Sequence, residues 1–266
     1  MISIRVTNKC NMNCGYCFYR NEFIENDNYN FDTLIRFLDE TTESTYGITG
    51  GEPLLYNNIE KLTAILSKKG KVILFTNGML LKKYNKMIID NNVIVQVSLD
   101  SIGEQISNHH LYKSLIVEEI LKLKNQGTRV VISYTITRDN ISNAHDIFTY
   151  ARANDIELSI GLLGFCPEKE IQLSQIKKVE EIYLENNDIL HSYMVDMFYG
   201  DKKKYPSVCR NSKENLFIDY DGKIYDCYHA RRFLGTINDS YDEVVRKQKN
   251  IKCEYNCFNP ACITLF

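Results

Sequence analysis

Three cysteines lie close together near the start of the chain, at Cys10, Cys14 and Cys17, in a CX3CX2C spacing. They come directly after a short apolar run, Ile2–Val6, which predicts a loop following a buried strand. A cubane iron–sulfur cluster normally takes four thiolates, so three leave one iron without a protein ligand. An open coordination position distinguishes a metal site that does chemistry from one that only supports a fold. The spacing therefore predicts a reactive iron–sulfur site.

Two other metal sites use close cysteines. A zinc knuckle would need a fourth cysteine or histidine nearby, and the first histidine of the chain is His109. Bacterial ferredoxins use a C-x2-C-x2-C run, which is a different spacing. The iron–sulfur interpretation is therefore preferred over both.

The cysteine spacing, with the aromatic Tyr16 directly before the third cysteine, resembles that of the radical S-adenosylmethionine (SAM) superfamily. The resemblance implies that the open iron is chelated by the amino and carboxylate groups of SAM. An electron from a [4Fe-4S] cluster then cleaves SAM to methionine and a 5′-deoxyadenosyl radical, which abstracts a hydrogen atom from the substrate. It also implies that Tyr16 offers its backbone to the adenine.

Polar residues follow the next predicted strands. Gly50-Gly51-Glu52-Pro53 comes after the second strand and resembles the GGE motif of this superfamily. Its glycines allow a close backbone approach to the methionyl end of SAM, and Glu52 can accept a charge-assisted hydrogen bond from the SAM ammonium. By itself, such a tetrapeptide is simply a turn.

The third and fourth strands end in further motifs of this kind. Thr76 and Asn77 end the third strand and also recur in the superfamily, with a turn role as plausible as a ligand role. Ser98 and Asp100 resemble the polar motif near the SAM ribose, and as alternate residues they share one face of a strand. Superfamily members often place an arginine some way after this motif to hold SAM, but none occurs here between Asp100 and Arg129.

Two residues at later strand ends are candidates for catalysis. Arg138 follows the fifth strand and either faces substrate or solvates its loop. Cys166 follows the sixth strand and is a candidate donor of a hydrogen atom to a substrate radical. A solitary cysteine is more often a small buried apolar residue.

Strands and helices alternate along the first 186 residues. The predicted strands are 2–6, 46–49, 72–76, 93–99, 129–137 and 156–162, and the predicted helices are 30–40, 58–68, 80–89, 115–124, 144–153 and 173–184. Six such units in succession predict a parallel sheet covered by helices, of the α/β class. Six are too few for a closed (β/α)8 barrel, so a partial (β/α)6 TIM-like barrel is expected, with its chemistry at the carboxyl ends of the strands.

The second predicted domain, 187–266, holds five cysteines. Cys209 and Cys227 flank a predicted hairpin whose two-residue turn is Asp221-Gly222, and a helix is predicted over 241–249. Cys253, Cys257 and Cys262 close the chain. This arrangement resembles the SPASM/Twitch extension of radical SAM enzymes. It implies an auxiliary [4Fe-4S] cluster held by Cys209, Cys227 and two of the last three cysteines; a zinc site is the alternative.

Composition restricts the other classes of function. The 266 residues carry a net charge of −2, so no broad basic field favours nucleic acid. No signal peptide and no apolar run of about 20 residues is present, so neither export nor a membrane span is expected. Eight of the nine cysteines fall into two clusters, one towards each end of the chain, which suits metal thiolates in a reducing cytoplasm.

The resemblance implies reductive SAM cleavage and hydrogen abstraction, with electrons from a donor such as flavodoxin or ferredoxin. The substrate preferred at this point is a ribosomally made peptide, modified by crosslinking, thioether formation or epimerisation. A separate peptide-recognition protein can present such a peptide to the enzyme. The first alternative is a dehydrogenase that oxidises a small molecule such as a sugar or cyclitol alcohol. The second is a non-catalytic metal-binding protein.

Overall fold

The computed structural model describes residues 1–19, 30–102, 110–163, 168–187, 215–227 and 231–249. The chain divides into two compact units. One comprises Met1–Gln96 with Val208–Tyr255, and the other comprises Val97–Ser207 with Asn256–Phe266. Each unit is described by itself.

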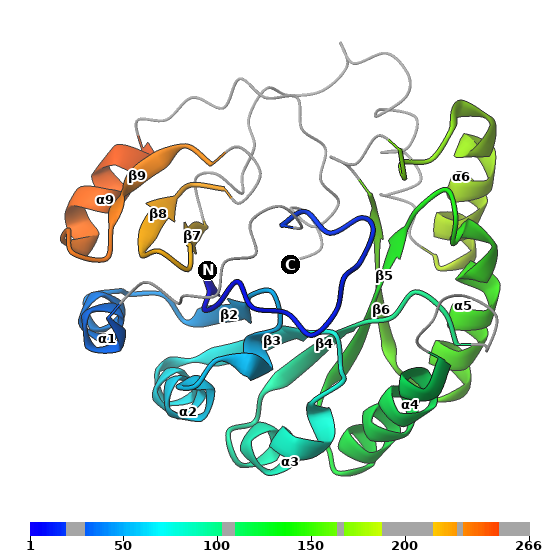
Figure 1. The fold of residues 1–266 in the computed structure, drawn as a ribbon, viewed down its shortest axis with the longest axis horizontal. Helices are drawn as coiled ribbons and strands as arrows, with labels where there is room; N and C mark the ends of the chain where they lie inside the picture. Colours follow the sequence, from blue (N-terminus) through cyan, green and yellow to red (C-terminus); the bar gives the residue numbers. More distant parts are fainter. Residues whose placement is uncertain (20–29, 103–109, 164–167, 188–214, 228–230, 250–266) are drawn as a thin grey trace. The chain divides into compact units, whose positions relative to one another are not determined.

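Strands and helices alternate in the described part of the chain as the sequence predicted (Figure 1). The strands are β1 (Ile2–Arg5), β2 (Thr45–Thr49), β3 (Lys71–Thr76), β4 (Ile94–Ser98), β5 (Val130–Ile136) and β6 (Glu157–Leu162). The helices that follow them are α1 (Phe31–Asp39), α2 (Ile59–Lys69), α3 (Leu81–Asp90), α4 (His110–Asn125), α5 (Ala144–Ala153) and α6 (Ile176–Glu185). The α/β class with parallel strands is therefore confirmed.

In the first unit, β1 lies between two parallel neighbours. It pairs with β2, where Ile2 is opposite Tyr46, and with β7 (Leu216–Ile218), where Ile2 is opposite Leu216. β2 in turn pairs in parallel with β3. Ile2 and Ile4 are fully buried, as expected for a strand with a neighbour on each side and apolar residues against the helices.

Local chemistry explains where the first helix begins. The side-chain oxygen of Asn30 accepts hydrogen bonds from the backbone N–H groups of Asp32 and Thr33, at 2.8 and 3.2 Å. Asn30 is therefore the N-cap of α1, and it satisfies two donors that a helix start leaves without intrahelical partners. Leu34 and Leu38 form part of the buried face of the helix.

In the second unit, β5 and β6 pair in parallel, and α4 ends at a glycine as the sequence predicted. The N–H of Gly127 donates to the carbonyl of Lys124 at 2.9 Å, and the N–H of Thr128 donates to that of Leu123 at 3.0 Å. These two bonds form a Schellman motif, in which Gly127 adopts a left-handed conformation with φ of 86°.

The C-terminal hairpin exists, but its loop is longer than predicted. β7 pairs antiparallel with β8 (Lys223–Tyr225), and β8 with β9 (Phe233–Thr236). The N–H of Gly222 donates to Asp219 and that of Asp219 donates to Lys223, so the loop comprises the three residues 220–222. The prediction of a two-residue turn at Asp221-Gly222 is therefore wrong. Gly222, with φ of 79°, supplies the left-handed third position that a three-residue loop requires.

The hairpin joins the first strand of the chain, because β7 pairs with β1. It is followed by α9 (Tyr241–Lys249), with the bounds that the sequence predicted. The expected domain boundary between 186 and 187 stays a prediction, since residues 188–214 lie outside the described residues. Among the described helices, none combines the length and apolar character that crossing a bilayer requires.

The Schellman glycine gives a test of the fold. We expect Gly127→Ala to lower the free energy of unfolding by about 1–2 kcal/mol, because a Cβ is disfavoured at positive φ. Gly161→Ala is the matched control, since an added Cβ there meets no atom within 4 Å. Urea unfolding followed by circular dichroism measures both. Equal stabilities of the two variants would contradict the assignment.

Candidate functional site

The three cysteines at the start of the chain lie on the loop that follows β1. Cys10, Cys14 and Cys17 are reduced thiols with part of their surface exposed. The N–H of Met12 donates to the sulfur of Cys10 at 3.4 Å, and the N–H of Cys17 donates to the carbonyl of Cys14 at 3.1 Å. The second bond turns the chain between the second and third cysteines.

Backbone hydrogen bonds attach the loop after β2 to the start of this cysteine loop. The N–H of Gly51 donates to the carbonyl of Thr7 at 2.8 Å, and that of Glu52 to the carbonyl of Lys9 at 2.7 Å. A Cβ on Gly51 would lie 2.3 Å from the Lys9 oxygen, and one on Gly50 2.9 Å from the Thr7 oxygen. The glycines thus permit close contact with the cysteine loop, a reason for them that the sequence alone did not suggest.

Glu52 holds the loops after β2 and β3 together. Its side chain is buried, and one carboxylate oxygen accepts from the N–H of Leu54 at 3.1 Å and from the hydroxyl of Thr76 at 2.8 Å. The other oxygen accepts from the N–H of Asn77 at 2.9 Å. The first of these bonds also caps the short helix η2 (Pro53–Leu55).

Asn77 connects the third strand end back to the cysteines. Its side-chain N–H2 donates to the side-chain oxygen of Asn11 at 2.8 Å, and its own oxygen accepts from the N–H of Met79 at 3.0 Å. Asn11 lies between the first two cysteines. The loops after β1, β2 and β3 therefore form one hydrogen-bonded assembly, which contains nine of the predicted site residues: Cys10, Cys14, Tyr16, Cys17, Gly50, Gly51, Glu52, Thr76 and Asn77.

Burial governs the electrostatics of this assembly. It raises the pKa of Glu52, against the lowering effect of the three bonds that the carboxylate accepts. Burial also raises the pKa of the Cys10 thiol, and the negative charges of Glu52 and Cys17 act in the same direction. Cys10 is therefore a thiol at neutral pH in the absence of metal, whereas a bound metal ion would hold it as the thiolate.

None of the hydrogen bonds described above between these loops involves the other predicted SAM-binding residues. Tyr16 is half-buried on the cysteine loop. Ser98 is exposed at the end of β4 and Asp100 is half-buried just after it, in the second unit. The backbone carbonyl of Asp100 accepts from the side chain of Asn143 at 3.0 Å. These three residues keep their roles as predictions.

Of the two candidate catalytic residues, one is described. The Nε of Arg138 donates to the carbonyl of Glu170 at 2.9 Å, and its backbone N–H donates to that of Lys169 at 2.9 Å. Arg138 is thus attached to the segment after β6. Cys166 lies outside the described residues.

Of the five C-terminal cysteines, Cys227 is described, as a buried reduced thiol at the end of the hairpin. The remaining four lie outside the described residues: Cys209, Cys253, Cys257 and Cys262. The auxiliary cluster therefore remains a prediction. Across the described ranges, which include Cys10, Cys14 and Cys17, no group of three or more His, Cys, Asp or Glu side chains converges closely enough to hold a metal ion.

Two residues with a part in this region escaped the sequence analysis. Asn11 could have been found from its place between two cysteines, where a polar side chain can link neighbouring loops. Arg5 stands within the apolar run of the first strand, and a charged residue there signals a buried ion pair. It is fully buried and bonded to Asp219.

Comparison with known proteins identifies the family of the chain. The family model of the radical SAM superfamily matches residues 4–114. A GTP 3′,8-cyclase of Staphylococcus epidermidis is 30% identical over 86% of this chain and 78% of its own length. The chain belongs to the radical SAM superfamily.

One further relative and one solved structure are also similar to this chain. A probable GTP 3′,8-cyclase of Methanococcus aeolicus is 29% identical over 77% of this radical SAM chain and 72% of its own length. The crystal structure of SuiB from Streptococcus suis bound to its precursor peptide SuiA has a TM-score of 0.73 at 15% identity. It covers 92% of this chain, which spans 64% of SuiB. This likeness supports the expected fold, the partial (β/α)6 barrel.

Membership implies SAM and a [4Fe-4S] cluster, and the cysteine loop fits such a cluster chemically. It offers three reduced thiols within eight residues, all partly exposed. Thiolate is the usual protein ligand of iron–sulfur clusters. Cys10, Cys14 and Cys17 would hold the cluster.

Gly51 allows a test of the contact between loops. We expect Gly51→Ala to lower the free energy of unfolding by about 1–3 kcal/mol, because the new Cβ would overlap the Lys9 carbonyl and displace the cysteine loop. Urea unfolding checks this, with Gly161→Ala again as the control. A loss no larger than that of the control would show that the close contact does not exist.

Glu52 gives a pH-dependent test in iron-free protein. Its folded-state pKa is raised above the ordinary value of 4.5, so the carboxyl stabilises the fold most when protonated, and this advantage is lost as the pH rises through the folded-state pKa. Relative to Glu52→Gln, the wild type should therefore lose unfolding free energy as the pH rises above 4.5. Glu60→Gln, exposed on α2, is the control. If the unfolding free energy of the wild type instead increased relative to that of Glu52→Gln as the pH rose, the direction of the pKa shift would be wrong.

Proposed function

We propose that this chain is an enzyme that cleaves SAM reductively and uses the resulting radical to abstract a hydrogen atom from an organic substrate. The observation that carries the proposal is the joining of three strand-end loops around Glu52, with the CX3CX2C thiols on one of them. When bound, the cluster supplies the electron that cleaves SAM to the 5′-deoxyadenosyl radical. The protein supplies position and exclusion of water.

The residues of the assembly divide these tasks. Cys10, Cys14 and Cys17 would bind iron. The Glu52 carboxylate accepts hydrogen bonds from three neutral donors. Its buried negative charge favours a cationic ligand such as the SAM ammonium. Gly50 and Gly51 allow the loop after β2 to lie against the cysteine loop, and they are proposed to let its backbone approach the methionyl end of SAM. Tyr16, Ser98 and Asp100 are proposed to bind the adenosyl part.

We also propose a second [4Fe-4S] cluster of the SPASM/Twitch type. Cys227 lies two residues after the hairpin strand β8, close to the hairpin end where that resemblance implies a ligand, and it is buried and reduced. Cys209 and two of the three last cysteines would complete its ligands. A zinc ion is the alternative occupant, because it takes the same tetrahedral thiolate set.

Two substrate classes have support. The relatives at 29–30% identity are named GTP 3′,8-cyclase, which makes GTP the first substrate to test. The sequence analysis preferred a ribosomally made peptide, and SuiB, which shares the fold, was solved with a precursor peptide. GTP has the stronger argument of the two, since it comes from relatives that match most of the chain.

Metal loading tests the core of the proposal. Anaerobically prepared wild type should contain about eight irons per chain, and a Cys10/Cys14/Cys17→Ala variant about four, as two four-iron clusters require. Reduced wild type with SAM should form 5′-deoxyadenosine and the variant should not. A wild type that forms no 5′-deoxyadenosine would refute the proposed chemistry. Four irons that fall to none in the variant would refute the auxiliary cluster alone.

The same preparation decides between substrates. Reduced enzyme with SAM should convert GTP to a product of unchanged mass that is cyclised between C3′ and C8, detected by liquid chromatography and mass spectrometry. ATP is the control. If GTP is recovered intact while a cysteine-containing precursor peptide loses two hydrogen atoms, the peptide is the substrate.

A further inference from the structure

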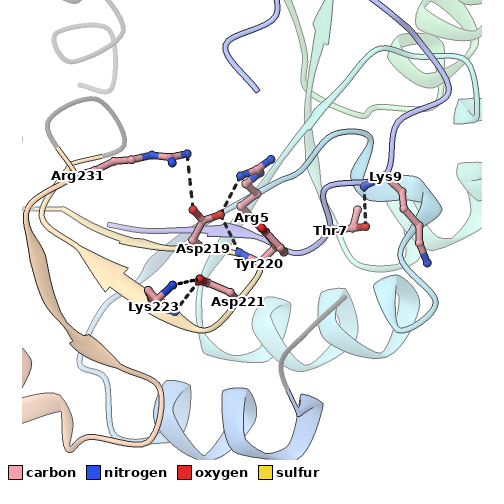
Figure 2. A network of polar contacts seen from close by, with 8 residues as sticks. All are labelled: Arg5, Thr7, Lys9, Asp219, Tyr220, Asp221, Lys223 and Arg231. Carbon is pink, nitrogen blue, oxygen red and sulfur yellow. Dashed lines mark hydrogen bonds and ion pairs between the residues drawn. The ribbon is translucent and has the colours of Figure 1, made fainter. Parts of the chain in front are cut away.

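Arg5, the last residue of β1, is a fully buried charge, and Figure 2 shows it beside Asp219. Its Nη1 lies 3.1 Å from a carboxylate oxygen of Asp219. β1 and β7 pair in parallel with Ile4 opposite Ile218, so Arg5 and Asp219 each come one residue after paired positions on neighbouring strands. The ion pair therefore joins the first strand to the C-terminal hairpin, across 214 residues of sequence.

The same guanidinium contacts the end of the cysteine loop. Its carbon lies 3.6 Å from the ring centroid of Tyr19 and 4.8 Å from that of Tyr220. The guanidinium lies over the face of the Tyr19 ring, which is the geometry of a cation–π contact. Tyr19 comes two residues after Cys17, and two residues span at most about 7 Å.

A second arginine reaches the same group. Nη2 of Arg231 lies 3.6 Å from the other oxygen of Asp219, and its guanidinium lies 5.3 Å from the Tyr19 ring and 5.5 Å from the Phe18 ring. The N–H of Arg231 donates to the carbonyl of Cys227 at 3.0 Å. Asp219 thus connects two cations that both lie against the residues directly after Cys17.

We infer that Arg5, Asp219, Arg231 and Tyr19 form a latch through which the C-terminal hairpin positions the third cysteine of the SAM cluster site. The inference rests on the proposed function for the identity of that site. Asp219 and the two arginines are positioning residues in this account, and they act on Cys17 through Tyr19.

The physical basis is that a guanidinium cannot lose its proton and, once buried, must keep an anionic partner. Arg5 can therefore be buried against Tyr19 only when the hairpin brings Asp219 into place. Pairing of β7 with β1 and ordering of the chain after Cys17 are coupled for that reason. Asp219 also accepts from the N–H of Tyr220 at 2.8 Å, which fixes the carboxylate at the start of the hairpin loop.

Asp219→Asn is the test, because it removes the charge and keeps the shape. Asp221→Asn is the matched control: Asp221 lies in the same hairpin loop, and its carboxylate binds Lys223 (Figure 2). In the iron-loaded protein, hydrogen exchange of the amides of residues 14–19 should be faster in Asp219→Asn and unchanged in Asp221→Asn. The Kd for SAM should rise roughly tenfold in Asp219→Asn and stay unchanged in Asp221→Asn. Loss of a group that orients a metal ligand typically weakens binding by about 10- to 100-fold, and we expect the lower value.

A double variant, Arg5→Met with Asp219→Leu, separates positioning from folding, since apolar replacement of a buried ion pair commonly preserves the fold. Its circular dichroism should match wild type while exchange at residues 14–19 remains fast. Wild-type exchange at residues 14–19 in both Asp219→Asn and the double variant would overturn the latch. Absence of SAM cleavage by the wild type would overturn the proposed function instead, and the exchange measurement would still decide whether the hairpin orders this segment.

Discussion

One buried carboxylate holds the candidate site together. Glu52 accepts from the hydroxyl of Thr76 and from the N–H groups of Leu54 and Asn77, and so it joins the loops after β2 and β3. Its own N–H donates to Lys9 at the start of the cysteine loop. A buried charge with unmet hydrogen bonds is costly, so each loop is restrained by the need to supply its donor. The positions of the cysteines follow from that restraint.

The Arg5–Asp219 pair applies the same principle on the other edge of β1. Loss of one partner of a buried ion pair typically costs about 3–5 kcal/mol, because the remaining charge has nothing to offset its burial. Glu52 restrains the loop ahead of Cys10, whereas Arg5 contacts Tyr19 beyond Cys17. The cysteine loop is consequently held near both of its ends, by two charges of opposite sign.

Much of the secondary structure could be predicted from local sequence. Asn30 as N-cap and Gly127 as the end of α4 depend on neighbouring residues, and the alternation of apolar runs located six strands. The pairing of β7 with β1 could not be predicted, because it joins residues about 214 positions apart and no local pattern records it. The hairpin loop was mistaken by one residue, since Asp-Gly suits a two-residue turn as well as the end of a three-residue one. The donors to Glu52 depend on how three separate loops pack.

The place of β1 has a consequence for synthesis on the ribosome. β2 follows β1 closely along the chain, but the partner on its other edge is residues 216–218. At about 5–20 residues per second, roughly ten to forty seconds separate translation of β1 from translation of that partner. During that interval an apolar strand has one edge without its final partner, which is a common starting point for aggregation. Assembly of the cysteine loop in its final form must therefore await almost the whole chain.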